Sequence, residues 1–183
     1  MRRVGLIRGK DTAKPFFGGA DFLAVLCIVG LHLANAQGGD INLSGSDYAG
    51  DLSAKEAWEI LKSDESARLI DVRTMPEWAF VGIPDLASLS KKPLFLSWQL
   101  FPNMQQNPEF IDQIRGAGAK PSDTLLFICR SGGRSRMAAM AMTSQGFEKC
   151  YNIAGGFEGD HDGANHRGSV DGWKVADLPW IQE

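Results

Sequence analysis

The chain has 183 residues, of which 44% are hydrophobic and 22% are charged, as in a soluble globular protein. This length suits one ordinary domain with an appendage. The formal net charge of -3 argues against a broad nucleic-acid-binding surface, and three cysteines are too few for a disulfide framework.

The N-terminal segment differs from the rest of the chain. A basic start is followed by an uncharged apolar run at residues 22–34 and by the small-x-small triplet Ala34-Asn35-Ala36. The apolar run is shorter than the roughly 20 residues that a membrane-spanning helix needs. These features predict an export signal at residues 1–36 and a periplasmic or otherwise exported mature protein without stable membrane association. Two alternatives stay open: a membrane anchor that uses residues 22–36, and a cytoplasmic protein whose assigned start lies too far upstream.

Residues 37–50 are rich in Gly, Ser and Asp and are predicted to form a flexible linker. Ser53, followed three residues later by Glu56, forms a capping-box pattern that predicts a helix ending near residue 62. The run RLIDVR (68–73) is short, apolar and rich in β-forming residues, so it predicts a buried strand. Pro76 then suits the first turn of a short helix over residues 77–80.

The second half of the chain continues this alternation of strands and helices. Strands are predicted at 93–99 (PLFLSWQ), at 124–129 (TLLFIC) and at 150–156 (CYNIAGG). Between them, Asn107 is expected to cap a helix that is stopped by glycines 116 and 118, and residues 135–145 are expected to form another helix. The tryptophans of the C-terminal tail are expected to pack back on the domain.

This order of elements predicts an α/β fold, with a parallel β-sheet flanked by helices on both faces. In such sheets ligands bind at the carboxyl ends of the strands. Cys129 and Asp71 each lie at the end of a predicted strand. Both are therefore candidates for a site at that edge of the sheet.

The segment CRSGGRS (129–135) joins the most apolar strand to a helix and favours a reactive cysteine. A thiol reacts as its thiolate. Three features would stabilise this anion: the positive N-terminus of the following helix, the glycines 132 and 133, which let successive N–H groups turn inward, and the charges of Arg130 and Arg134.

The neighbouring sequence agrees with this interpretation, because no acidic residue lies within residues 124–145. The alternative is that Cys129 is an inert buried cysteine, as we expect for Cys150. A disulfide between Cys129 and Cys150 also stays open.

Residues 51–183 resemble a single rhodanese domain, of the small bacterial type of this sulfurtransferase family. The resemblance rests on motifs that occur in the expected order: LIDVR (69–73), Glu77-Trp78, Ile83-Pro84, LLFICRSGGRS (125–135), YNIAGGFEG (151–159) and the closing GW and LPW (172–180). The cysteine loop is the most specific of these motifs.

The resemblance implies that Cys129 takes a sulfane sulfur from thiosulfate or a similar donor and becomes a persulfide. It would then pass the sulfur to a thiophilic acceptor such as cyanide, a small thiol or a protein thiol. The backbone N–H groups of residues 130–134 would hold the persulfide anion, and Arg130 and Arg134 would bind the sulfonate end of thiosulfate. The other implied site residues are Ser131, Gly132, Gly133 and Ser135 in the loop, Asp71 beneath it, and Arg73 in a structural ion pair. This chemistry requires no cofactor, metal ion or nucleic acid.

Two other functions stay open. A rhodanese module that carries sulfur or binds a partner without catalysis would keep the same fold. A phosphatase or arsenate reductase shares the fold in one branch, but its loop needs Arg six positions after Cys, and position 135 is Ser.

The acidic and histidine residues within 160–166 have the spacing of neither a calcium loop nor a zinc site.

Overall fold

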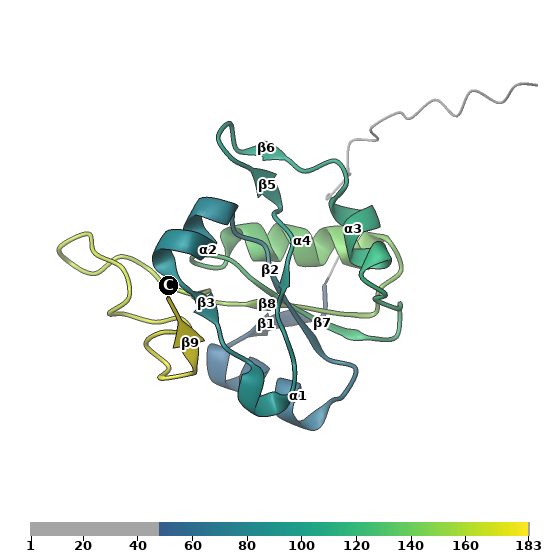
Figure 1. Cartoon of the computed structure of the whole chain (residues 1–183), viewed down its shortest axis with the longest axis horizontal. Helices are drawn as coiled ribbons and strands as arrows, with labels where there is room; N and C mark the ends of the chain where they lie inside the picture. Colours follow the sequence, from purple (N-terminus) through teal and green to yellow (C-terminus); the bar gives the residue numbers. More distant parts are fainter. Residues whose placement is uncertain (1–47, 183) are drawn as a thin grey trace, which may run out of the picture. The chain divides into compact units, whose positions relative to one another are not determined.

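A five-stranded parallel sheet forms the centre of the protein (Figure 1). The computed structural model describes residues 48–182. Every neighbouring pair of strands in this sheet is parallel. In spatial order the strands are β1 (Gly50–Leu52), β8 (Lys149–Ile153), β7 (Thr124–Ile128), β2 (Arg68–Asp71) and β4 (Leu94–Phe95).

Helices cover both faces of the sheet, as the sequence predicts. Helix α1 (Ala54–Ser63) lies on one side, and α3 (Phe110–Gly116) and α4 (Gly133–Ser144) lie on the other (Figure 1). Successive side chains of a strand point to opposite faces. In the fully buried β7, Leu125 and Phe127 therefore pack with α3 and α4, whereas Leu126 and Ile128 pack with α1. The predicted α/β fold is confirmed.

The capping signals locate two helix starts. The Glu56 N–H donates to Ser53 Oγ at 3.2 Å and the Ser53 N–H donates to the Glu56 carboxylate at 2.8 Å, which confirms the predicted capping box of α1. Helix α2 spans Met75–Val81 and begins earlier than the predicted residue 77. The reason is a second capping box between Thr74 and Glu77, which the prediction overlooked.

The prediction of one strand over residues 93–99 is wrong. Strand β4 ends at Phe95, although the N–H groups of Leu96 and Trp98 still donate to the carbonyls of Asp71 and Val72. The Trp98 side chain is buried in the core, where its ring centroid lies 5.0 Å from that of Phe110. The next segment, β5 (Gln99–Leu100), pairs antiparallel with β6 (Gln105–Gln106) in a separate hairpin. The N-cap of α3 is Glu109, two residues later than the predicted Asn107. Asn107 still supports the start of this helix, because its Oδ1 accepts from the Glu109 N–H at 3.0 Å while its Nδ2 donates to the Ser97 carbonyl.

Two further predicted boundaries need correction. The strand predicted at 150–156 ends at Ile153, because Gly155 and Gly156 adopt positive φ angles of 75° and 58° that a strand does not accommodate. Gly50 belongs to β1 and not to a flexible linker, because it pairs in register with Tyr151 of β8. The predicted export signal and the rest of the predicted linker up to residue 47 lie outside the described residues.

The C-terminal tail packs back on the domain, as predicted. Trp173 is fully buried and its ring meets that of Trp58 edge to face, with the centroids 5.9 Å apart. A short strand β9 (Trp180–Ile181) pairs antiparallel with β3 (Ile83–Pro84), which is followed by a 3-10 turn at Ala87–Leu89. Within residues 48–182, no helix combines the length and the apolar character needed to cross a membrane.

Candidate active site

Cys129 directly follows β7, at the carboxyl edge of the sheet, and only 2% of its surface is exposed. The Gly132 N–H donates to Cys129 Sγ at 3.1 Å, and Ser135 Oγ lies 3.2 Å from the same sulfur. The loop therefore folds back over Cys129, and its Gly132 N–H group donates a hydrogen bond to the thiol.

The loop ends at the N-terminus of α4, which begins two residues earlier than predicted. Gly132 is the N-cap and has φ 95°, a backbone conformation that L-residues with a side chain rarely adopt. The first N–H groups of a helix have no partner within the helix. In the described part of the chain, the N–H groups of residues 131 and 133–135 donate to no protein acceptor. Donors for an anion are therefore available beside Cys129.

Backbone bonds from the segment after β8 hold the start of the loop. The Phe157 N–H donates to the Cys129 carbonyl at 2.8 Å, and the N–H groups of Glu158 and Gly159 donate to the Arg130 carbonyl at 2.9 Å and 3.2 Å. A side chain at Gly156 would come within 2.5 Å of the Cys129 carbonyl oxygen. Gly156 thus allows the segment after β8 to pass close to the Cys129 backbone, whereas Gly155 makes room for Asp171.

The two arginines of the loop have different environments. Arg130 is exposed, and no described residue forms a hydrogen bond or an ion pair with its side chain. Arg134 is mostly buried, and its two terminal nitrogens donate to the two carboxylate oxygens of Glu77 at 2.8 Å and 2.6 Å. Arg130 is therefore available to a ligand, whereas Glu77 holds both terminal nitrogens of Arg134.

Glu77 was not predicted as a site residue, although the capping-box spacing from Thr74 is visible in the sequence. Burial alone would raise the pKa of Glu77, but hydrogen bonds from Arg134 and from the N–H and hydroxyl of Thr74 lower it to about 2. Burial alone would lower the pKa of Arg134, but its contacts with Glu77 raise it. The pair is therefore fully ionised at neutral pH.

Asp71 and Arg73 form a buried ion pair in which neither side chain is exposed, as predicted for Arg73. Asp71 pairs in register with Ile128, the residue before Cys129, but its carboxylate bonds to Arg73 and not to the loop. The support that Asp71 gives is indirect: the Arg73 guanidinium lies 4.1 Å over the ring of Phe157, whose N–H holds the Cys129 carbonyl.

A cavity of about 1000 Å³ adjoins the loop. Arg130 and Arg134 line it on one side, and Phe101 of the turn between β5 and β6 lines it on another. Phe101 is 62% exposed, whereas Trp98 is buried in the core.

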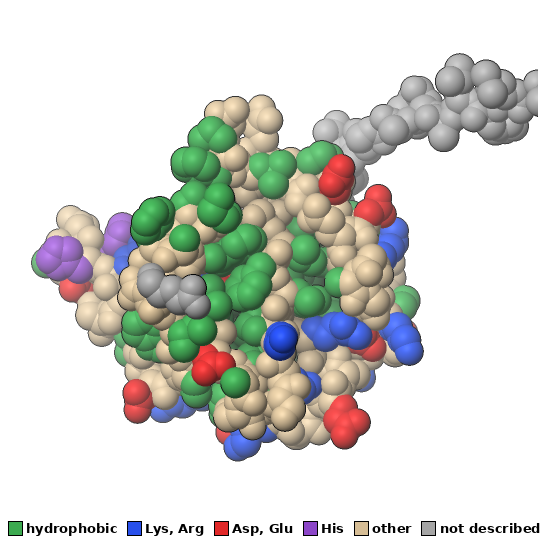
Figure 2. Space-filling view, viewed as in Figure 1, with side chains coloured by type: hydrophobic (Ala, Val, Ile, Leu, Met, Phe, Trp, Pro, Cys, Tyr) green, Lys and Arg blue, Asp and Glu red, His purple; other side chains and the backbone are tan. Residues whose placement is uncertain are grey.

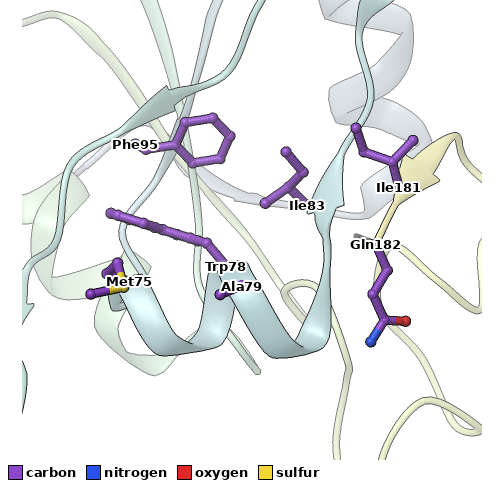
Figure 3. Close-up of a pocket in the computed structure, with 7 residues that line it drawn as sticks. All are labelled: Met75, Trp78, Ala79, Ile83, Phe95, Ile181 and Gln182. Atoms are coloured by element: carbon purple, nitrogen blue, oxygen red, sulfur yellow. The ribbon is translucent and has the colours of Figure 1, made fainter.

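The cavity is lined by charged and polar residues as well as by Val81, Phe101 and Met104, and exposed apolar side chains lie on two of the elements that line it. Figure 2 shows hydrophobic side chains gathered over α2 and the β5–β6 hairpin, where Met75, Phe80 and Phe101 are exposed. A separate pocket of about 350 Å³ lies on the flank of α2, and there the rings of Trp78 and Phe95 lie at a centroid distance of 5.3 Å (Figure 3). None of the predicted site residues lines this second pocket.

Cys150 is fully buried, and burial raises the pKa of its thiol to about 11. It pairs in register with Leu125, four residues before Cys129. At about 3.3 Å per residue this separation is far beyond the roughly 7 Å that a disulfide can bridge. A disulfide between the two cysteines is therefore excluded, and both are free. Among the described residues, no group of three or more His, Cys, Asp or Glu side chains is placed to hold a metal ion.

A family model described as the STR4 middle domain matches residues 49–183. The chain belongs to this family. The chain is 41% identical over 129 residues to an uncharacterized protein of Rickettsia rickettsii. This match covers 70% of this chain and 94% of the other protein. The chain is 40% identical to Rv0390 from M. tuberculosis, and that crystal structure superposes with a TM-score of 0.69 over 75% of this chain and 100% of the other.

More distant matches of the chain include one rhodanese-like protein and two sulfur transferases. The chain is 30% identical over 131 residues to Rhodanese-like domain-containing protein 4 of Arabidopsis thaliana chloroplasts, covering 71% of this chain and 25% of that one. It is 26% identical over 109 residues to thiosulfate sulfurtransferase GlpE of Actinobacillus pleuropneumoniae, covering 60% and 83%. A polysulfide-sulfur transferase homodimer from Wolinella succinogenes shares the fold, with a TM-score of 0.51, 21% identity, and 73% and 78% coverage. The fold is rhodanese-like.

Proposed function

We propose that the protein is a small, single-domain sulfurtransferase that carries sulfur as a persulfide on Cys129. The observation that carries this proposal is the hydrogen bond of 3.1 Å from the Gly132 N–H to Cys129 Sγ at the N-terminus of α4. N–H groups at such a position stabilise an anion through direct hydrogen bonds and through the helix dipole. The names of the distant relatives support the same reaction class.

In the first half-reaction, the Cys129 thiolate attacks the outer sulfur of thiosulfate. The sulfur–sulfur bond of thiosulfate breaks, and sulfite leaves with the electron pair. The new persulfide carries its negative charge on the outer sulfur, within reach of the loop N–H groups. In the second half-reaction, cyanide or a thiolate attacks that outer sulfur and Cys129 leaves again as a thiolate, so no oxidant or cofactor is consumed.

Arg130 is the residue best placed to bind the sulfonate end of the donor. It lines the cavity and is exposed, and a charge-assisted bond to an oxyanion is stronger than a neutral one. Arg134 contributes mainly by stabilising the loop, because Glu77 accepts hydrogen bonds from both of its terminal nitrogens.

The same arrangement argues against a phosphatase or an arsenate reductase. Such an enzyme needs an arginine of the loop to enclose a tetrahedral oxyanion. Here Ser135 occupies that position in the loop and Arg134, the preceding residue, is paired with Glu77. A sulfur carrier without turnover is the second candidate, because it requires the same persulfide but no release to a small acceptor.

The proposal is tested by incubating the protein with thiosulfate and measuring its intact mass and the sulfite released. Cys150→Ser is the matched control, since Cys150 is fully buried and far from the loop. We expect a gain of one sulfur atom in the wild type and in Cys150→Ser but not in Cys129→Ser, and we expect cyanide to remove it as thiocyanate. A sulfur that stays on Cys129 after cyanide treatment would indicate a carrier. Failure of Cys129 to take sulfur from any sulfane donor would exclude the proposal.

A further inference from the structure

A chain of hydrogen bonds leads from Cys129 to the protein surface. Ser135 Oγ lies 3.2 Å from Cys129 Sγ, 3.1 Å from the Gly132 carbonyl oxygen and 2.6 Å from Asn152 Oδ1. On its other side Asn152 Nδ2 donates to Asp51 Oδ1 at 2.7 Å. Ser135 and Asn152 are 0% and 2% exposed, so water does not compete for these bonds.

The donors and acceptors in this chain can be assigned from their chemistry. An ionised carboxylate only accepts, so the Asn152 NH₂ group must face Asp51 and the Asn152 carbonyl must face Ser135. That carbonyl also only accepts. The single hydroxyl proton of Ser135 is therefore directed to Asn152, which is the closest of its three neighbours.

Asp51 is well suited to fix this direction. Burial alone would raise its pKa, but hydrogen bonds from Tyr48, Asn152 and Arg136 lower it, so Asp51 is an anion at neutral pH. The Arg136 guanidinium lies 2.6 Å from Asp51 Oδ2 and the Tyr48 hydroxyl donates to Oδ1 at 2.6 Å. Arg136 is exposed, and its guanidinium holds Asp51 in place.

We propose that Asp51 and Asn152 are positioning residues for Cys129, which fix the Ser135 hydroxyl so that its lone pairs, and not its proton, face the sulfur. This inference rests on the proposed function, because it concerns the reactivity of the same thiol. In the resting enzyme, Ser135 Oγ accepts the proton of the Cys129 thiol. When that proton leaves, Ser135 does not donate to the thiolate, so the anion relies on backbone N–H groups and keeps its nucleophilicity. When sulfur is bound, the charge moves to the outer sulfur and the Ser135–Asn152–Asp51 arrangement needs no change.

Other charged and titratable groups lie around the loop and its cavity. They are Asp71 at the end of β2 and Arg73 after it, Glu77 on α2, Arg130 and Arg134 of the loop, and Glu158, His166 and Arg167 after β8. A test must therefore separate the direction of one hydroxyl proton from the general effect of charge.

The test is the rate of Cys129 alkylation by iodoacetamide as a function of pH, in a double-mutant cycle of Asp51→Asn and Ser135→Ala. Asp51→Asn keeps the shape of the side chain but lets the Asn152 amide turn over, so that Ser135 is free to donate to the thiolate. We expect the midpoint of the profile to move to lower pH by about 0.5 to 1 unit, which is a three- to tenfold faster reaction below the midpoint. In the Ser135→Ala background the same change should move the midpoint by less than about 0.2 unit, since no hydroxyl proton remains to be redirected.

Arg136→Gln is the matched control, because it removes the ion pair of Asp51 but leaves the bond to Asn152 intact; its profile should not move to lower pH. Asp51 is at the surface, with 37% of its side chain exposed, so Asp51→Asn should fold normally. Equal displacements with and without the Ser135 hydroxyl would show that Asp51 acts as a plain charge and would overturn the proposal, as would no displacement at all. Alkylation reports on the thiol alone, so either result is independent of whether Cys129 transfers sulfur.

Discussion

Replacing Glu77 with Gln removes the carboxylate that holds Arg134 beside the cysteine loop, and the cost can be worked out from the structure. Hydrogen bonds from Arg134 and Thr74 outweigh the effect of burial and lower the pKa of Glu77 from 4.5 to about 2. Each unit between the folded and unfolded pKa corresponds to about 1.4 kcal/mol, so this carboxylate contributes about 3 kcal/mol to the free energy of unfolding at neutral pH. The side chains of Arg134 and Glu77 are only 16% and 20% exposed, so solvent screens the pair weakly.

The sign of the pH dependence follows from the depressed pKa. The contribution of Glu77 is complete above its unfolded value of 4.5 and is lost as the pH falls toward its folded value of about 2. We therefore expect Glu77→Gln to lower the free energy of unfolding by about 3 kcal/mol at pH 7 and by about 2 kcal/mol at pH 3.5.

Urea denaturation at the two pH values measures both differences. Glu59→Gln is the matched control: Glu59 pairs with Lys62 on the surface of α1, with 67% of its side chain exposed, and its replacement should change stability by less than about 0.5 kcal/mol. A loss below about 1 kcal/mol for Glu77→Gln at pH 7, or a loss that does not shrink at pH 3.5, would refute the reasoning.

The remaining predictions concern the loop. Arg130→Ala should raise the KM for thiosulfate by about tenfold, the equivalent of one charge-assisted contact, while Arg134→Ala should act mainly on the denaturation midpoint; equal changes in KM would contradict the different roles assigned to them. Gly156→Ala should destabilise the protein by about 3 kcal/mol or more, because its Cβ would lie 2.5 Å from the Cys129 carbonyl oxygen in addition to the strain of a positive φ. Gly146→Ala shares the positive φ but meets nothing within 4 Å, so thermal denaturation should show a loss of only about 1 kcal/mol, and similar losses for both would be inconsistent with a close approach at Gly156.

Local patterns were sufficient to predict the frame of the fold and the identity of the cysteine loop. Continuous apolar runs marked β2 and β7, and the Ser53 capping box marked the start of α1. Such signals depend on residues that are near each other in the sequence, so they can be recognised without knowledge of tertiary contacts. The strand predicted at 93–99 failed for the opposite reason, because its apolar residues serve two different structures, β4 and the core around Trp98.

The partners of the loop could not be predicted in the same way. The absence of acidic residues within 124–145 indicated that nothing nearby in the sequence opposes a thiolate at Cys129. In the fold, Arg134 forms hydrogen bonds with Glu77, which lies 57 residues away in the sequence. Asn152 donates a hydrogen bond to Asp51, which lies 101 residues away. Strand β1 carries Asp51 to its position, but it has only three residues and a composition typical of a linker.

The antiparallel pair of β3 and β9 places the C-terminal end of the described chain against α2 and Phe157. Lys174 lies over the rings of both Phe157 and Trp180 and donates to the last carbonyl of α2, and Gln182 reaches the carbonyl before it. Cleavage of the chain before Trp180 would remove the ring over which Lys174 lies and the contact of Gln182 with α2. We therefore expect trimming at the C-terminal end to loosen the packing of α2 and of Phe157, whose N–H holds the Cys129 carbonyl, while the cysteine loop itself stays intact.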